Sequence, residues 1–83
     1  MRRSRMDIII DVLEVAKVGA NKTSIVYRTN LNFKMAEKYL DWLQEHSMMA
    51  NRLDKYITTE KGNGFIEKVK SLNLYLENSN LIM

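Results

Sequence analysis

The first third of the chain has apolar positions that recur with the period of a helix. Ser4 precedes Asp7 by three residues, the spacing of a capping box, so a helix is expected to begin there. Gly19 supplies the left-handed residue that often ends a helix. Between them, apolar residues recur at i, i+4 and i+7 and neighbours widen the stripe: Ile9, Leu13 and Ala16, with Ile8, Val12 and Val15.

The helical pattern then breaks and restarts within four residues. The stretch KTSIVYRTN, residues 22–30, predicts a short second helix. In the following TNLN, the side chains of Thr29, Asn30 and Asn32 can bond their own backbone in preference to continuing a helix, and Asn32 suits the cap of the next one. A third helix is expected from Phe33 onward, with an apolar face of Ala36, Leu40 and Leu43 that is broadened by Tyr39 and Trp42.

The second half of the chain predicts a hairpin and a long helix. Two short runs, SMMA and KYITT, flank the polar NRLD, and residues 56–59 are all strand formers. Thr59 suits the cap of the last helix, with Glu60 in its first turn and ENSN at its end. Its apolar positions have the spacing of a coiled-coil seam of two heptads: Phe65, Val69, Leu72 and Leu76.

Three helices, a short β-hairpin wing and a long C-terminal helix define a mainly α fold, the winged helix-turn-helix. In a helix-turn-helix the second helix crosses the sugar-phosphate backbone and the third lies in the major groove, so the chain must turn sharply between them. We expect residues 1–60 to form the DNA-binding region and residues 61–83 the dimerisation helix and tail of a single domain. A monomer could cover the C-terminal seam only by folding that helix back, so a homodimer is expected.

Composition limits the possible classes of protein. Eighty-three residues form one domain, and 46% hydrophobic with 28% charged residues is typical of a globular protein. The chain has no cysteine and therefore neither a disulfide nor a thiolate metal site. The longest apolar stretch, IIIDVLEVAKV, is interrupted by Asp11, Glu14 and Lys17, so no membrane association and a cytoplasmic location are expected. A DNA-binding role would make that location nucleoid-associated.

The placement of charge favours a polyanionic partner. Residues 1–34 hold seven Lys or Arg against three acidic residues, whereas residues 35–60 hold three against five. This excess in the first half indicates double-stranded DNA as the partner. The candidate DNA contacts combine the second helix, the start of the third and the hairpin tip: Lys22, Thr23, Arg28, Asn32, Phe33, Lys34, Lys38, Arg52 and Lys55.

Several of these residues have a second interpretation. Asn32 is a cap whether or not it touches DNA, Thr23 can simply cap the second helix, and any of the basic residues can be a solvated surface charge. Three acidic residues of the third helix, Glu37, Asp41 and Glu45, repel phosphate, so its first two turns should face the groove. Near the N-terminus, a mobile arm with Arg2, Arg3 and Arg5 could enter a minor groove.

The residues needed for catalysis are missing from the sequence. His46 is the sole histidine, and its place at the end of a helix suits a structural role. With no cysteine and only scattered carboxylates, we expect neither an enzyme nor a cofactor, a metal or a small-molecule substrate. The GNG at residues 62–64 lacks the pattern of a phosphate loop, and Gly62 more simply lets the last helix approach the body closely. Trp42 is expected in the core or a dimer interface, and the methionines in the core.

The chain resembles the small archaeal winged-helix DNA-binding proteins that dimerise through a C-terminal antiparallel coiled coil. The resemblance rests on DIIIDVLEVAKVGANKTSIVYRTNLNFKMAEKYLDWL and YITTEKGNGFIEKVK and covers residues 3–76. It implies a homodimer with a transcription-regulator or chromatin-type role and a recognition helix at residues 32–44. Ser47 stands where members usually have a glycine that closes this helix, and the hairpin tip NRLD is short.

Two functional hypotheses follow. The first is a dimeric winged-helix DNA-binding protein, a transcriptional regulator or chromatin-type protein. The alternative is a winged-helix module that binds another protein without direct DNA binding, which the acidic residues of the third helix favour. A contiguous apolar patch outside the dimer seam would support the alternative, whereas a basic surface across both protomers would support DNA binding.

Overall fold

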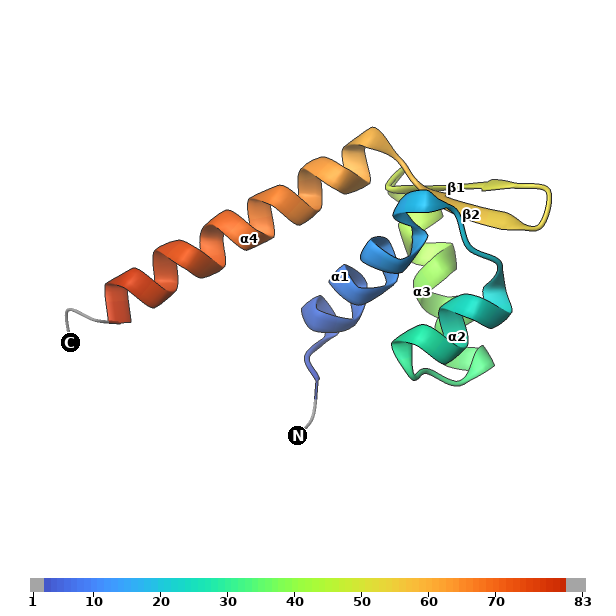
Figure 1. Ribbon diagram of the computed structural model, residues 1–83, viewed down its shortest axis with the longest axis horizontal. Coiled ribbons are helices and arrows are strands. Elements are labelled where there is room, and N and C mark those ends of the chain that lie inside the picture. The colour runs from blue at the N-terminus through green and yellow to red at the C-terminus, as the bar shows by residue number, and fades with distance from the viewer. Residues whose placement is uncertain (1–2, 81–83) are drawn as a thin grey trace.

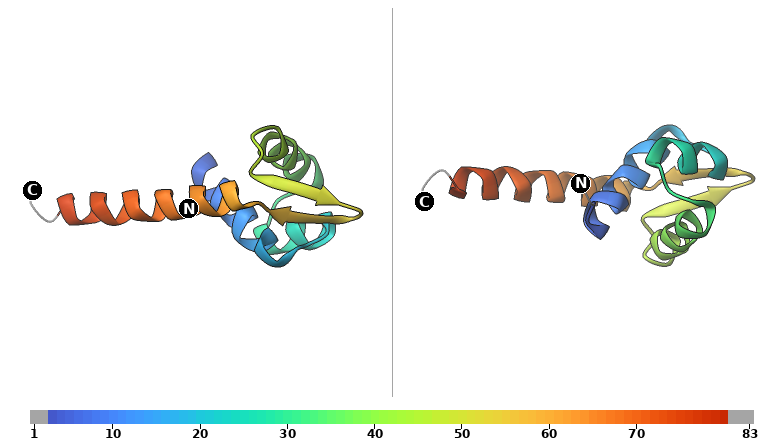
Figure 2. Two further views of the ribbon diagram at one scale, coloured as in Figure 1. Left: turned by 90° about the horizontal axis from the view of Figure 1, so that it is seen from above. Right: turned by 90° about the horizontal axis from the view of Figure 1, so that it is seen from below.

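The computed structural model describes residues 3–80 and has the expected order of elements. Three helices form a body from which a two-stranded hairpin and a long helix project in opposite directions (Figures 1 and 2). The elements are α1 (Arg5–Val15), the 3-10 turn η1 (Ala16–Val18), α2 (Lys22–Thr29), α3 (Phe33–Glu45), β1 (Met49–Arg52), β2 (Lys55–Thr58) and α4 (Glu60–Asn80). This is the predicted winged helix fold.

The first helix begins as its sequence predicts but ends earlier, at Val15, with Ala16 as its C-cap. The Ser4 hydroxyl accepts a hydrogen bond from the Asp7 amide and the Asp7 carboxylate accepts one from the Ser4 amide, each at 3.1 Å. This reciprocal pair satisfies two amides that the helix leaves without partners. Gly19 ends the 3-10 turn η1 that follows: it has φ +90°, and its amide donates to the Ala16 carbonyl at 3.0 Å.

The hairpin is a narrow antiparallel ribbon anchored to the body. Met49 pairs with Thr58 and Arg52 pairs with Lys55, which leaves a two-residue turn at the tip. An isolated bridge between Ala20 and Tyr56 ties β2 to the segment between α1 and α2. The Thr58 hydroxyl, which is buried, donates to the Leu13 carbonyl at 2.7 Å. The base of the wing is therefore fixed, while its tip is free.

The core draws on every part of the body. Six side chains are almost completely removed from solvent: Val12, Leu13, Ile25, Leu40, Leu43 and Ile66. Met48 and Met49 join this cluster at the start of the hairpin, as expected of methionines. Met6 and Met35, by contrast, are 43% and 37% exposed, so the expectation that the methionines lie in the core was wrong for these two. Trp42 is 38% exposed and therefore not a core residue, and its alternative place in a dimer interface stays a prediction.

The last helix is attached to the body through its first half. The Gly62 amide donates to the Thr59 hydroxyl at 3.1 Å, which confirms Thr59 as the cap. A Cβ at Gly62 would lie 2.3 Å from the Met48 carbonyl oxygen, so a glycine is required for this close approach. Ile66, outside the predicted seam, is the residue that α4 buries fully, while Phe65 and Val69 are half-buried. The seam therefore begins against the protein's own body.

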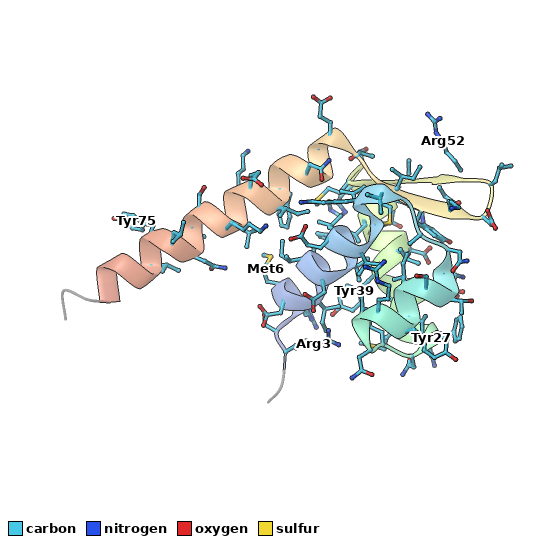
Figure 3. The ribbon with its side chains drawn as sticks, viewed as in Figure 1. Arg3, Met6, Tyr27, Tyr39, Arg52 and Tyr75 are labelled. Atoms are coloured by element: carbon cyan, nitrogen blue, oxygen red, sulfur yellow. The ribbon has the colours of Figure 1, made fainter. Side chains whose placement is uncertain are left out.

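The second half of α4 leaves the body. Four apolar side chains there are at least half exposed: Leu72, Leu74, Tyr75 and Leu76. Figure 3 shows Tyr75 on this part of the helix, far from the other labelled aromatic residues. Of the helices within residues 3–80, none is both long and apolar enough to cross a lipid bilayer.

Candidate nucleic-acid interface

The turn between α2 and α3 is formed by residues that do not continue a helix. Asn30 adopts the left-handed conformation with φ +58°, a state that asparagine tolerates better than most residues. The Leu31 amide bonds the Val26 carbonyl at 3.1 Å, and Leu31 itself is half-buried against the core. Asn32 then caps α3, accepting a hydrogen bond from the Met35 amide at 2.8 Å. The predicted turn and cap are confirmed.

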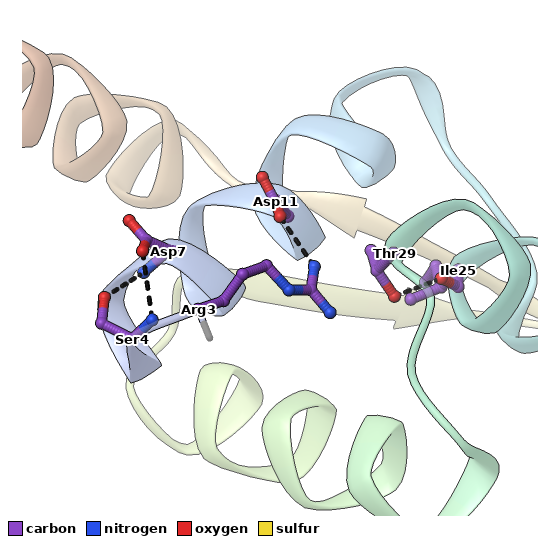
Figure 4. A network of polar contacts seen from close by, with 6 residues as sticks. All are labelled: Arg3, Ser4, Asp7, Asp11, Ile25 and Thr29. Carbon is purple, nitrogen blue, oxygen red and sulfur yellow. Dashed lines mark hydrogen bonds and ion pairs between the residues drawn. The ribbon is translucent and has the colours of Figure 1, made fainter. Parts of the chain in front are cut away.

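The ends of α2 are fixed by polar groups. Asn21 caps the helix by accepting a hydrogen bond from the Ser24 amide at 2.8 Å. The interpretation of Thr23 as the cap was therefore wrong, and its exposed side chain lies in the first turn instead. At the far end, the buried Thr29 hydroxyl donates to the Ile25 carbonyl at 2.5 Å (Figure 4). This bond competes with helix continuation and helps to end α2.

The outer face of α3 carries exposed cations in its first two turns. Lys34 and Lys38 are exposed, and neither belongs to an ion pair among the described residues. Phe33, the first residue of the helix, is 52% exposed. The opposite face is buried through Ala36, Leu40 and Leu43, as predicted. The helix is thus held by one face and presents the other to solvent.

One predicted contact, Lys22, is already paired with a carboxylate of α3. Its Nζ lies 2.8 Å from Glu37 Oε2, and both side chains are at the surface. The hydrogen bond to Glu37 raises the pKa of Lys22, and the same bond lowers the pKa of Glu37. Both groups therefore remain ionised over a wider pH range, and Lys22 offers a phosphate a weaker net charge than Lys34 or Lys38 does.

The exposed end of α2 offers two further side chains. Arg28 is exposed and has no ion pair among the described residues. Tyr27 is 79% exposed, and Figure 3 shows it on the outside of α2. Its neighbours Ile25 and Val26 are buried. Because successive residues of an α-helix are rotated by about 100° about the helix axis, Tyr27 points away from the buried face.

The tip of the wing brings Arg52 and Lys55 together. They face each other as the last pair of the ribbon, and both are exposed. Figure 3 shows Arg52 directed away from the helical body. Between them, Leu53 is 99% exposed. The sequence predicted the two cations of this tip but gave no role to the leucine.

The predicted N-terminal arm is not free over the residues that can be described. Arg3 Nη1 donates to Asp11 Oδ2 at 2.9 Å, which folds Arg3 against α1 (Figure 4). Arg5 is the first residue of α1 rather than part of an arm. Arg2 lies outside the described residues. Arg3 is thus paired with α1 and Arg5 is part of it, and the entry of these residues into a minor groove stays a prediction.

A shallow apolar hollow of about 400 Å³ lies between the start of α1 and α3. Arg5 and Lys38 line it together with apolar and aromatic side chains, namely Ile9, Met35, Tyr39 and Trp42. Trp42 also stacks on His46 with ring centroids 4.1 Å apart. His46 is the C-cap of α3, the position predicted for it, and its Nδ1 lies 2.9 Å from the Trp42 carbonyl. Within residues 3–80, no three His, Asp or Glu side chains are grouped as metal ligands.

Comparison with known proteins identifies relatives of this architecture. Residues 2–77 match the profile of a family described as winged helix-turn-helix. The chain is similar to the crystal structure of Sso10a-2, a DNA-binding protein from Sulfolobus solfataricus. The TM-score is 0.72 at 27% identity, and the match covers 94% of this chain and 90% of that one.

Two proteins of Methanocaldococcus jannaschii are similar in sequence. The uncharacterized protein MJ0287 is 32% identical over 62 residues, which is 74% of this chain and 64% of that protein. The uncharacterized protein MJ0290 is 27% identical over 73 residues, 87% of this chain but only 35% of that protein. The chain thus spans less than two thirds of the length of either relative.

Proposed function

Since the chain belongs to the winged helix-turn-helix family, we propose that it binds double-stranded DNA as a homodimer through α3. The role is that of a transcriptional regulator or a chromatin-type protein associated with the nucleoid. The first two turns of α3 enter the major groove, with Asn32, Phe33, Lys34 and Lys38 nearest the bases and phosphates. Lys22, Thr23, Arg28, Arg52 and Lys55 contact the sugar-phosphate backbone on either side.

One observation carries this proposal above the others. The amphipathic helix after the turn buries one face in the core and exposes two unpaired lysines and a phenylalanine on the other. A helix of this kind is narrow enough for the major groove, and its lysines can bond guanine edges or phosphates. The similarity to Sso10a-2, a DNA-binding protein, supports the same role for this chain.

The homodimer is proposed from the exposed part of α4. Leu72 and Leu76 belong to the predicted seam and are 57% and 50% exposed. Apolar side chains spaced by four along an exposed helix are stabilised when a second helix covers them. We therefore assign residues 1–60 to DNA binding and residues 61–83 to dimerisation and the tail, within one domain.

A gel-shift titration with random duplex at several salt concentrations tests the function directly. If each protomer neutralises about three or four phosphates, log affinity falls against log salt with a slope of about −5 to −7 per dimer. Binding that does not change with salt, or no binding of duplex at low salt, would contradict the proposal.

A protein-binding role is the second candidate, and two observations favour it. Glu37, Asp41 and Glu45 are exposed on α3, where they repel phosphate. The hollow between α1 and α3 is largely apolar and lies outside the predicted seam. If duplex binding fails at low salt while substitution of Trp42 abolishes capture of a partner protein, this second role replaces the first.

A further inference from the structure

The turn at the tip of the wing contains a leucine in an unfavourable backbone conformation. Leu53 has φ +58°, the left-handed region, within the two-residue turn between Arg52 and Lys55. A leucine in this region brings its Cβ too close to the following carbonyl oxygen. Hairpin turns with positive φ at their first central residue normally have glycine there, and asparagine also tolerates it.

Of the three other residues with positive φ among residues 3–80, two obey this preference, and the third is a small polar residue, Ser47 at φ +61° after α3. The left-handed residue between α2 and α3 is Asn30, at the same φ of +58°, and the residue with positive φ after η1 is Gly19. Leu53 is the only large apolar residue with positive φ among residues 3–80. Backbone geometry therefore does not explain the choice of leucine.

Packing does not explain it either. The Leu53 side chain is 99% exposed and contributes nothing to the core. An unburied apolar residue at a strained backbone position is an outlier that motivates a hypothesis of function.

The chemistry around Leu53 matches that of a DNA wedge. Two cations, Arg52 and Lys55, flank it, and Asp54 is the one acidic residue in the turn, so the four tip residues carry a net charge of +1. Proteins that kink duplex DNA insert apolar side chains such as leucine between base pairs from the minor groove, while adjacent basic residues bind the phosphates. The bridge between Ala20 and Tyr56 holds the base of the hairpin on the body, from which the tip can bring such a side chain to the duplex.

We infer that Leu53 is an apolar wedge that enters a base step and bends the bound duplex. Because pyrimidine-purine steps unstack most easily, the wing prefers duplexes with a TA or CA step at the position it reaches. The proposal rests on the proposed DNA binding and adds to it a bending activity located in the wing rather than in α3.

The test compares the full chain with Leu53→Asn, Leu53→Met and Arg52→Ala on a duplex of about 25 base pairs labelled at both ends for energy transfer. The wild-type protein should shorten the distance between the ends, and Leu53→Met should retain this bend. Leu53→Asn should abolish the bend and weaken binding by about 10-fold or more. Arg52→Ala should weaken binding and leave the bend of the saturated complex unchanged.

Thermal unfolding separates this role from a structural one. Because asparagine accepts a left-handed backbone, Leu53→Asn should raise the unfolding midpoint by a few degrees, on the order of 4 °C. A lowered midpoint, or a bend equal to that of the wild type, would overturn the wedge. If wild-type protein binds duplex without bending it, the wedge fails while the proposed function stands. If wild-type protein binds no duplex at low salt, both fail.

Discussion

The two halves of α4 differ in what they contact, although they belong to one continuous helix. The first half is bound to the body: Gly62 lies against the hairpin, and Ile66 is completely buried. The second half exposes Leu72, Leu74 and Leu76 by at least 50%. The first half therefore completes the fold of a single protomer, whereas the second half has an apolar surface that a single protomer leaves uncovered.

This difference separates a body with a complete core from a helix whose apolar side chains a single protomer leaves exposed. At the start of each α-helix, a side-chain oxygen accepts a hydrogen bond from a first-turn backbone amide; these capping residues are Ser4, Asn21, Asn32 and Thr59. The core of the body needs nothing from α4 beyond the first turns. The remaining helix is free to present apolar side chains, and the comparison predicts that substitutions in the two halves affect different properties.

The largest effect is expected from truncating the buried residue of the first half. Ile66→Ala removes packed methyl groups from a site with no exposed surface and should lower the free energy of unfolding by about 3 kcal/mol. Leu74→Ala, the same kind of truncation at a side chain 61% exposed, should change it by less than about 0.5 kcal/mol. Urea unfolding at one fixed protein concentration measures both. Equal losses would mean that the two halves of α4 do not differ.

The second largest effect is expected on association. Leu72→Glu places a charge in the proposed seam and should weaken the dimer by about 100-fold, because a buried charge without a partner is strongly unfavourable. Ser71→Glu adds the same charge at the adjacent exposed residue outside the seam and should leave the dimer intact. Sedimentation at tens of micromolar should give twice the 9.8 kDa protomer mass for wild type and Ser71→Glu. A monomeric wild type would remove the coiled-coil seam from the account.

Much of the fold could be predicted from the sequence because its signals are local. The Ser4–Asp7 capping box, the cap by Asn32 and the periodic face of α3 each depend on residues within one or two turns. The winged helix order of elements follows from these local signals. The choice of Asn21 over Thr23 as the cap of α2 was missed because both suit that position and only the backbone geometry of residue 21 decides between them.

The features that could not be predicted depend on contacts across the chain. Nothing local pairs Arg3 with Asp11 or Lys22 with Glu37, and the second of these pairs lies 15 residues apart. Ile66 is fully buried and Phe65 only half-buried, which depends on how α4 packs on the body and not on the spacing of its apolar residues alone. Leu53 was missed because a left-handed turn residue is normally recognised by glycine or asparagine. The interface on α3 remains a prediction.

The central claim concerns the body: the outer flank of α3 binds duplex DNA, and the surface of α4 does not. Affinities of Lys34→Glu and Lys68→Glu for one duplex at one low salt concentration test it most directly. Both residues are exposed lysines without an ion pair among the described residues, one on each helix. The account predicts that Lys34→Glu weakens binding by about 10-fold or more while Lys68→Glu has little effect. Equal losses for the two variants would contradict it.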